Sequence, residues 1–165
     1  MSFKEEIRQG NRFGFGKNWL NFSKSIDEKK INDAINTLKY FYGVESLNGK
    51  NFIDVGSGSG IFSLASSIIG AETLSFDYDE NSVECTANLK EKYAIDKNWI
   101  IEQGSILDSD YIESLGKFDY VYSWGVLHHT GDMNLAFDNV SKLVKDKGKL
   151  FIAIYNDQGI KSKIW

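Results

Sequence analysis

Residues 51–60 read NFIDVGSGSG, and this stretch decides the fold. Residues 52–55 have the apolar character of a short buried strand, and three alternate glycines then lead into another apolar run: Gly56, Gly58 and Gly60. A strand, a glycine turn and a helix form half of a nucleotide-binding unit, because glycine lets the backbone approach a ligand with no Cβ in the way. The dinucleotide fingerprint GxGxxG would need a glycine where Ile61 stands, so the pattern here is a different one.

Strand-like and helix-like segments alternate after residue 51. The patterns predict strands at 52–55, 73–77, 99–103, 120–123 and 149–155, and helices at 61–69, 80–93, 110–115 and 133–144. A turn at Lys147-Gly148 is expected to precede the last strand. Such alternation implies parallel pairing and right-handed crossovers. The predicted fold class is therefore α/β, a Rossmann-like parallel sheet with helices on both faces.

We expect two regions, an arm with a helix over residues 1–50 and a ligand-binding domain over 51–165. Asp27 is a predicted N-cap, apolar residues then recur at helical spacing over 31–42, and Gly43 ends the helix. Residues 1–25 mix glycines with aromatic residues and show no clean period. Two interpretations stay open for this arm: a packed N-terminal extension, or a flap in which Asn18-Trp19 closes over the ligand.

Composition narrows the classes of function. The chain has 165 residues, a net charge of −4 and a pI near 5.2, which argues against a broad nucleic-acid-binding surface. Its one cysteine, Cys85, cannot form an internal disulfide and fits a reducing cytoplasm. No apolar run approaches the roughly 18 residues of a membrane span, and MSFKEEIRQG lacks the apolar segment of a signal peptide. These features predict a cytoplasmic protein without a membrane span.

Asp77 is the candidate for binding a ribose. It ends an otherwise apolar strand and lies 21 residues beyond Gly56, and an acid in that place can accept both ribose hydroxyls. Asp79 is better placed to cap the next helix. Tyr78 either lays its ring against adenine or is a surface aromatic.

Both histidines of the chain, His128 and His129, stand side by side after the fourth predicted strand. Ligands bind at the carboxyl ends of strands in open α/β sheets, so a histidine here could take a proton from an acceptor. The alternative is that the histidines only shape the loop. We predict no metal site, because adjacent histidines without cysteines or a second cluster do not make a zinc constellation.

In order and spacing, the segments DVGSGSG, FDYD, EQGSILD, FDYVYSWGVLHHTGD and KLFIAIYNDQG resemble the class I S-adenosylmethionine (SAM) dependent methyltransferases. SWGVLHHTGD looks like their LHH-containing small-molecule group, and the whole chain, including the arm RFGFGKNW, resembles a bacterial set of methyltransferase-domain proteins. The resemblance implies that the methionine part is held around Asp54, Gly56, Ser57, Gly58 and Gly60. It further implies that Asp77 holds the ribose, that Ser105 and Ile106 flank adenine with Ser105 where the family commonly has an acid, and that backbone near Ser123 and Trp124 faces the sulfonium.

The implied function is methyl transfer from SAM to a small-molecule acceptor, at oxygen or carbon, with S-adenosylhomocysteine (SAH) as product. Two alternatives stay open: an RNA- or protein-directed methyltransferase, and a SAM-binding module that has lost catalysis. The resemblance also implies a C-terminal antiparallel hairpin, which is missing from the predicted elements. We therefore expect an exposed last strand that promotes self-association or lowers stability.

Overall fold

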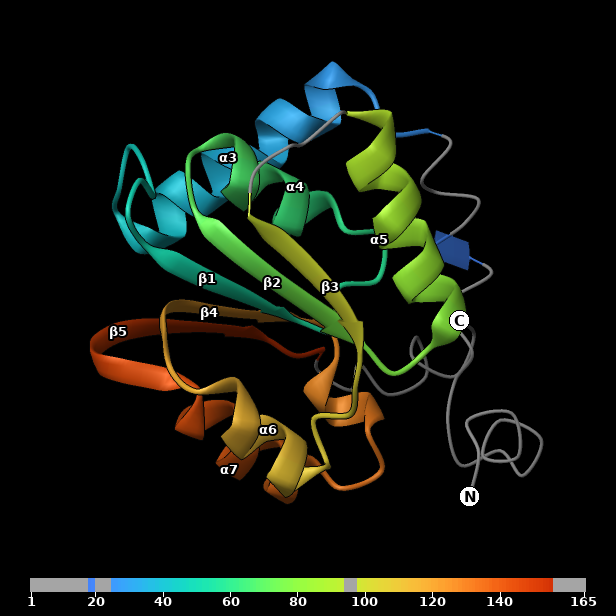
Figure 1. The fold of residues 1–165 in the computed structure, drawn as a ribbon, viewed down its shortest axis with the longest axis vertical. Helices are drawn as coiled ribbons and strands as arrows, with labels where there is room; N and C mark the ends of the chain where they lie inside the picture. Colours follow the sequence, from blue (N-terminus) through green and yellow to red (C-terminus); the bar gives the residue numbers. More distant parts are fainter. Residues whose placement is uncertain (1–17, 20–24, 94–97, 156–165) are drawn as a thin grey trace.

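The sheet has five parallel strands in the order β3-β2-β1-β4-β5. The structure is a computed structural model that describes residues 18–19, 25–93 and 98–155. The strands are β1 Asn51–Val55, β2 Glu72–Asp77, β3 Trp99–Gln103, β4 Phe118–Trp124 and β5 Val144–Ala153. The chain runs outward from β1 to β3 and then returns to β4, so the strand order reverses between β1 and β4. The α/β Rossmann-like class is confirmed (Figure 1).

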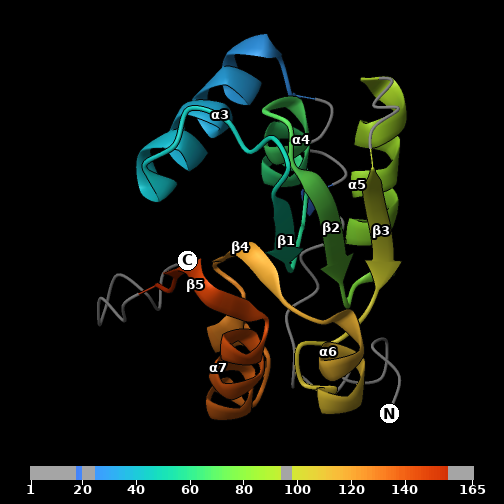
Figure 2. The ribbon, with the colours of Figure 1, turned by 60° about the vertical axis from the view of Figure 1, so that its left-hand side comes forward.

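Helices cover both faces of the sheet (Figures 1 and 2). One face carries α3 Glu28–Tyr42, α4 Ile61–Ile68 and α5 Glu80–Lys92; the other carries α6 Ser109–Leu115 and α7 Met133–Lys142. A short 3-10 helix, η1 Leu127–His129, follows β4. No helix in these described stretches combines the length and apolar character that a membrane crossing requires.

The central strand β1 explains why the two layers hold together. Its alternate side chains face opposite layers, so Phe52 packs with α3 and α4 while Ile53 and Val55 pack with α6 and α7. All three are fully buried. A strand that is apolar on both faces is what a parallel sheet between two helical layers requires.

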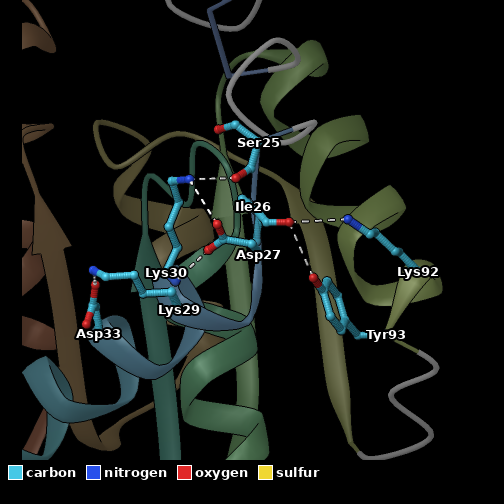
Figure 3. A network of polar contacts seen from close by, with 8 residues as sticks. All are labelled: Ser25, Ile26, Asp27, Lys29, Lys30, Asp33, Lys92 and Tyr93. Carbon is cyan, nitrogen blue, oxygen red and sulfur yellow. Dashed lines mark hydrogen bonds and ion pairs between the residues drawn. The ribbon is translucent and has the colours of Figure 1, made fainter.

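The predicted helix caps are confirmed. Asp27 accepts a hydrogen bond from the Lys30 backbone N–H at 2.8 Å, Asp79 caps α5, and Gly43 ends α3 with φ 65°. The start of α3 also contacts the end of α5 (Figure 3). There the Ile26 carbonyl accepts hydrogen bonds from the Lys92 and Tyr93 side chains.

The predicted boundaries of the last helix and strand were wrong. Helix α7 ends at Lys142, and β5 begins at Val144 instead of 149 and ends at Ala153. Residues 145–148 form a bulge opposite the single residue Asp119, with Lys147 at φ 66°. The Lys145 Nζ donates to Asp119 at 2.9 Å and to the Asn51 side chain, which anchors the bulge to β1 and β4. The Lys-Gly turn signal was real, but it lies inside the strand.

Candidate active site

A cavity of about 170 Å³ lies at the carboxyl ends of the five strands, where ligands bind in open α/β sheets. Its lining residues are Trp19, Val55, Gly56, Phe76, Asp77, Tyr78, Asp79, Ser82, Gly104, Ser105, Ile106, Trp124, Gly125, Val126, His129, Thr130 and Tyr155. Seven of the predicted site residues are among them: Gly56, Asp77, Tyr78, Ser105, Ile106, Trp124 and His129. The other six are not in this lining: Asp54, Ser57, Gly58, Gly60, Ser123 and His128.

The glycine turn after β1 depends on the absence of side chains. Gly56, Gly58 and Gly60 have φ values of 78°, 55° and 77°, in the left-handed region that favours glycine. A Cβ on Gly56 would lie 2.5 Å from a methyl carbon of Val126, and one on Gly58 would lie 2.9 Å from the Trp19 indole. The turn is therefore tightly enclosed by Val126 on one side and Trp19 on the other.

Asp77 joins the end of β2 to the glycine turn. Its carboxylate accepts hydrogen bonds from the Gly58 N–H at 2.9 Å and from the Asp79 N–H at 3.0 Å. Burial raises the pKa of Asp77 to about 6. Each carboxylate oxygen keeps a second lone pair, so the group can still accept hydrogen bonds from ligand hydroxyls in the cavity.

Asp54 lies behind the turn. Its side chain is 3% exposed and accepts a 2.5 Å hydrogen bond from the Ser63 hydroxyl in the first turn of α4. Burial raises the pKa of Asp54 to about 7. In this structure Asp54 therefore connects β1 to α4, and its role toward a methionine part stays a prediction.

The loop after β3 forms the wall predicted for adenine. The Ser105 hydroxyl accepts from the Leu107 N–H at 3.2 Å, and the Ile106 carbonyl accepts from the Asn139 side chain at 2.8 Å. A Cβ on Gly104 would lie 2.3 Å from the Tyr111 ring. This need for glycine was missed from sequence, because Tyr111 reaches the loop only through the packing of α6.

Two of the predicted site residues lie at the end of β4, and one of them is buried while the other is exposed. The Ser123 hydroxyl is fully buried and donates to the Val55 carbonyl at 3.1 Å, so it joins β4 to β1. Trp124 lines the cavity and is 43% exposed. Its ring is nearly parallel to those of Phe62 and Phe151.

The two histidines have different positions in η1. The His129 ring lines the cavity, and the His128 ring lies behind it with 3.9 Å between ring centroids. Both ring nitrogens of His128 are buried and have no hydrogen-bond partner within the described residues. Burial lowers the pKa of both histidines, and the neighbouring His128 lowers that of His129 further. Both rings are therefore mainly neutral near pH 7.

Apart from Trp19, nine lining residues were not predicted from the sequence as part of the site: Val55, Phe76, Asp79, Ser82, Gly104, Gly125, Val126, Thr130 and Tyr155. Tyr155 contacts both histidine rings edge-on, at centroid distances of 5.1 and 6.2 Å. The signal was available, since β5 follows β4 in the sheet and its carboxyl end lies beside the histidine loop. Trp19 lines the cavity, while the glycines proposed for the same flap, Gly10, Gly14 and Gly16, lie outside the described residues.

The chain is similar in sequence to curated methyltransferases. The chain is 30% identical to a ubiquinone biosynthesis O-methyltransferase of Coxiella burnetii over 119 residues, which are 72% of this chain and 49% of that protein. It is 42% identical to a ribosomal protein L11 methyltransferase of Helicobacter hepaticus over 71 residues, 42% of this chain and 22% of that protein. The chain therefore spans about half the length or less of these curated relatives.

Solved structures show the same fold. A protein of Methanococcus maripaludis assigned to the SAM-dependent methyltransferases superposes with a TM-score of 0.68 at 20% identity, over 83% of this chain and 61% of that one. Magnesium protoporphyrin IX methyltransferase of Synechocystis, solved with bound SAH, gives a TM-score of 0.63 at 16% identity, over 93% of this chain and 65% of that one.

Residues 46–164 match the family described as a methyltransferase domain. This match includes all five strands and, apart from Trp19, every residue that lines the cavity. The chain belongs to the class I SAM-dependent methyltransferase family.

Proposed function

We propose that the chain binds SAM in the cavity at the carboxyl edge of the sheet and transfers the methyl group to an oxygen or carbon of a small molecule. The observation that carries this proposal is the meeting of the glycine turn, Asp77 and His129 around one cavity. The transferred methyl is already activated by a positive sulfur. The protein therefore needs mainly to align the acceptor and exclude water.

We assign each part of the bound cofactor to a different group of residues around the cavity. Asp77 is available to the ribose hydroxyls, and Tyr78, Ser105 and Ile106 flank the adenine. The backbone of the glycine turn, with Ser57, and the carboxylate of Asp54 serve the methionine part. Backbone near Ser123 and Trp124 faces the sulfonium.

For a hydroxyl acceptor, we propose that His129 takes the proton. The reaction forms a carbon–oxygen bond, breaks the carbon–sulfur bond of SAM and leaves SAH, and the hydroxyl proton passes through a ring nitrogen of His129 to solvent. The lowered pKa of His129 keeps this ring unprotonated and able to accept. His128 packs against that ring and holds its orientation.

Calorimetry on Asp77→Ala tests the cofactor assignment. Loss of this acceptor for the ribose hydroxyls is expected to weaken SAM binding by about 1–3 kcal/mol, roughly 5- to 150-fold. Asp108→Ala is the matched control, because it also removes an aspartate that accepts a backbone N–H but lies outside the cavity lining. Unchanged SAM affinity in a folded Asp77→Ala protein would remove Asp77 from the site.

Transfer itself is tested with methyl-labelled SAM and a fractionated cell extract. Label in small metabolites is the expected result. Label in RNA or in protein would favour the macromolecule-directed alternative, which the partial match to the ribosomal protein methyltransferase keeps in view. Tight SAM binding with label in no fraction would indicate a binding module without catalysis.

We further propose that the protein acts in the cytoplasm and associates with itself along β5. Cys85, the single cysteine, is fully buried in α5, which fits a reducing compartment. In the described sheet β5 is an edge strand, and its apolar residues Leu150, Phe151 and Ile152 are only half-buried. Edge strands of this kind offer unpaired backbone groups to another chain.

A further inference from the structure

The cavity has two chemically different walls. The wall proposed for adenosine contains the two acids of the lining, Asp77 and Asp79. The opposite wall comes from the end of β4, the η1 loop and the end of β5, and it consists of Trp124, Gly125, Val126, His129, Thr130 and Tyr155. None of these six carries a fixed charge, and burial keeps His129 neutral near pH 7. An ionic group pressed against this wall would be desolvated without a charged partner there.

Trp124 gives this wall a flat, fixed surface. Its ring lies 6.0 Å from Phe151 at an interplanar angle of 16° and 6.3 Å from Phe62 at 21°. Phe151 continues the row, stacking on Phe41 at 4.0 Å and on Tyr122 at 5.4 Å. Trp124 is the member of this row that also lines the cavity, and it is still 43% exposed. Its orientation is set by its neighbours, so binding a further ring costs little side-chain entropy.

Polar groups stand beside this surface. His129 and Tyr155 line the same wall, with their rings 6.2 Å apart, and Tyr155 is 61% exposed. A ring nitrogen and a phenolic oxygen can each take part in a hydrogen bond with a hydroxyl. The wall therefore pairs a flat apolar surface with hydrogen-bonding groups suited to an uncharged hydroxyl.

We propose that this wall is the acceptor site, and that the acceptor is an uncharged planar aromatic ring that stacks on Trp124 and presents its hydroxyl to His129. The inference rests on the proposed methyl transfer and narrows its acceptor to the phenol class. The products are then an aryl methyl ether and SAH, with the phenolic proton released through His129. A saturated aliphatic alcohol such as cyclohexanol lacks the flat aromatic face that Trp124 matches.

Phenol and cyclohexanol form the matched pair of probes, because they share size and hydroxyl and differ in planarity. Their binding to the SAH-loaded protein is measured by ligand-observed NMR titration. Phenol is expected to bind roughly 2- to 12-fold more tightly, as one ring contact provides. Equal binding of the two, or no binding of phenol, overturns the proposal, and neither outcome depends on a variant.

Variants then test whether the preference for phenol over cyclohexanol depends on Trp124. Trp124→Leu keeps apolar bulk without a ring and is expected to abolish the preference for phenol, whereas Trp124→Phe keeps most of it. Tyr40→Leu, at a ring that is 83% exposed on α3, is the surface control and leaves it unchanged. A phenol preference that persists in folded Trp124→Leu places the ring elsewhere. The affinity for SAH is measured separately by calorimetry. If the unaltered protein does not bind SAH, the proposed function is wrong, and this outcome is distinct from a failure to prefer phenol.

Discussion

Gly56 shows how one residue fixes the geometry of the cavity. Both its positive φ and the 2.5 Å approach of Val126 exclude a side chain. Gly43 has left-handed backbone too, with φ 65° and ψ 44°, but a Cβ there would meet only the Lys149 Nζ, at 4.0 Å. Substitutions at the two positions therefore distinguish the cost of backbone strain from the cost of a steric clash with a neighbouring side chain.

Gly43→Ala is expected to lower the free energy of unfolding by about 1–2 kcal/mol, the cost of left-handed backbone for alanine. Gly56→Ala should cost clearly more, because strain and the contact with Val126 act together. Adding Val126→Ala to Gly56→Ala should recover the excess. Urea denaturation of the four proteins measures this; equal losses at Gly56 and Gly43 would mean that Val126 moves aside without cost.

Asp54 makes stability depend on pH. Burial raises its pKa from 3.8 to about 7, so the folded state binds more protons than the unfolded state between these values. Stability from this group is therefore present at low pH and falls as pH rises from about 4 to 7, by at most about 1.4 kcal/mol for each pH unit. Asp77, with a pKa of about 6, acts in the same direction. His128 and His129, whose pKa values are lowered, act in the opposite direction below pH 6.5.

Asp54→Asn isolates the contribution of Asp54, because it keeps the shape and removes the ionisation. The difference in unfolding free energy between Asp54→Asn and the unaltered chain should grow in favour of the variant from pH 5 to pH 8. Urea titrations at several pH values give this difference, in which the contributions of the other groups cancel. A difference that stays constant with pH would mean that Asp54 titrates normally.

The η1 turn is the element that separates the two proposed halves of the reaction. Single alanine replacements of His128 and His129 are expected to leave SAH affinity within about twofold in calorimetry, since neither ring belongs to the wall proposed for adenosine. His129→Ala should lower the transfer of label to small metabolites strongly, and its pH profile should flatten near the pKa of the missing ring. If either replacement abolished SAH binding in a folded protein, the histidines would belong to the cofactor site.

At the scale of helices and strands, the sequence predicted most elements. It missed the boundaries that depend on residues far away in the chain. The strand, turn and helix at 51–69 carry local signals, and so do the caps at Asp27 and Asp79. The start of β5 was missed because its bulge is held by Lys145 against Asn51 and Asp119, which are far away in the chain. In the cavity, Gly56 and Asp77 were predicted from spacing, whereas Val126 reaches it only through its packing against the glycine turn.

At the scale of the whole molecule, the open edge of β5 predicts concentration-dependent association. Sedimentation velocity across a range of protein concentrations should show a dimer that grows with concentration. Ile152→Lys places a charge on this edge strand and should shift the population to monomer. The control is Glu72→Lys on β2, because Glu72 is exposed. Its neighbour Thr73 is buried and is therefore unsuitable. A monomer at all concentrations would remove the proposal of self-association.

The hydrogen bonds at the Ile26 carbonyl also bear on the order of events during synthesis. Their donors, Lys92 and Tyr93, follow 66 and 67 residues later in the chain. At a translation rate of about 5–20 residues per second, the ribosome needs roughly 3 to 13 seconds to produce that stretch. The beginning of α3 thus emerges well before its partners. The contact at Ile26 can form only after the β1, α4, β2 and α5 segments have left the ribosome, so this attachment of α3 is made late although α3 precedes the whole sheet in the chain.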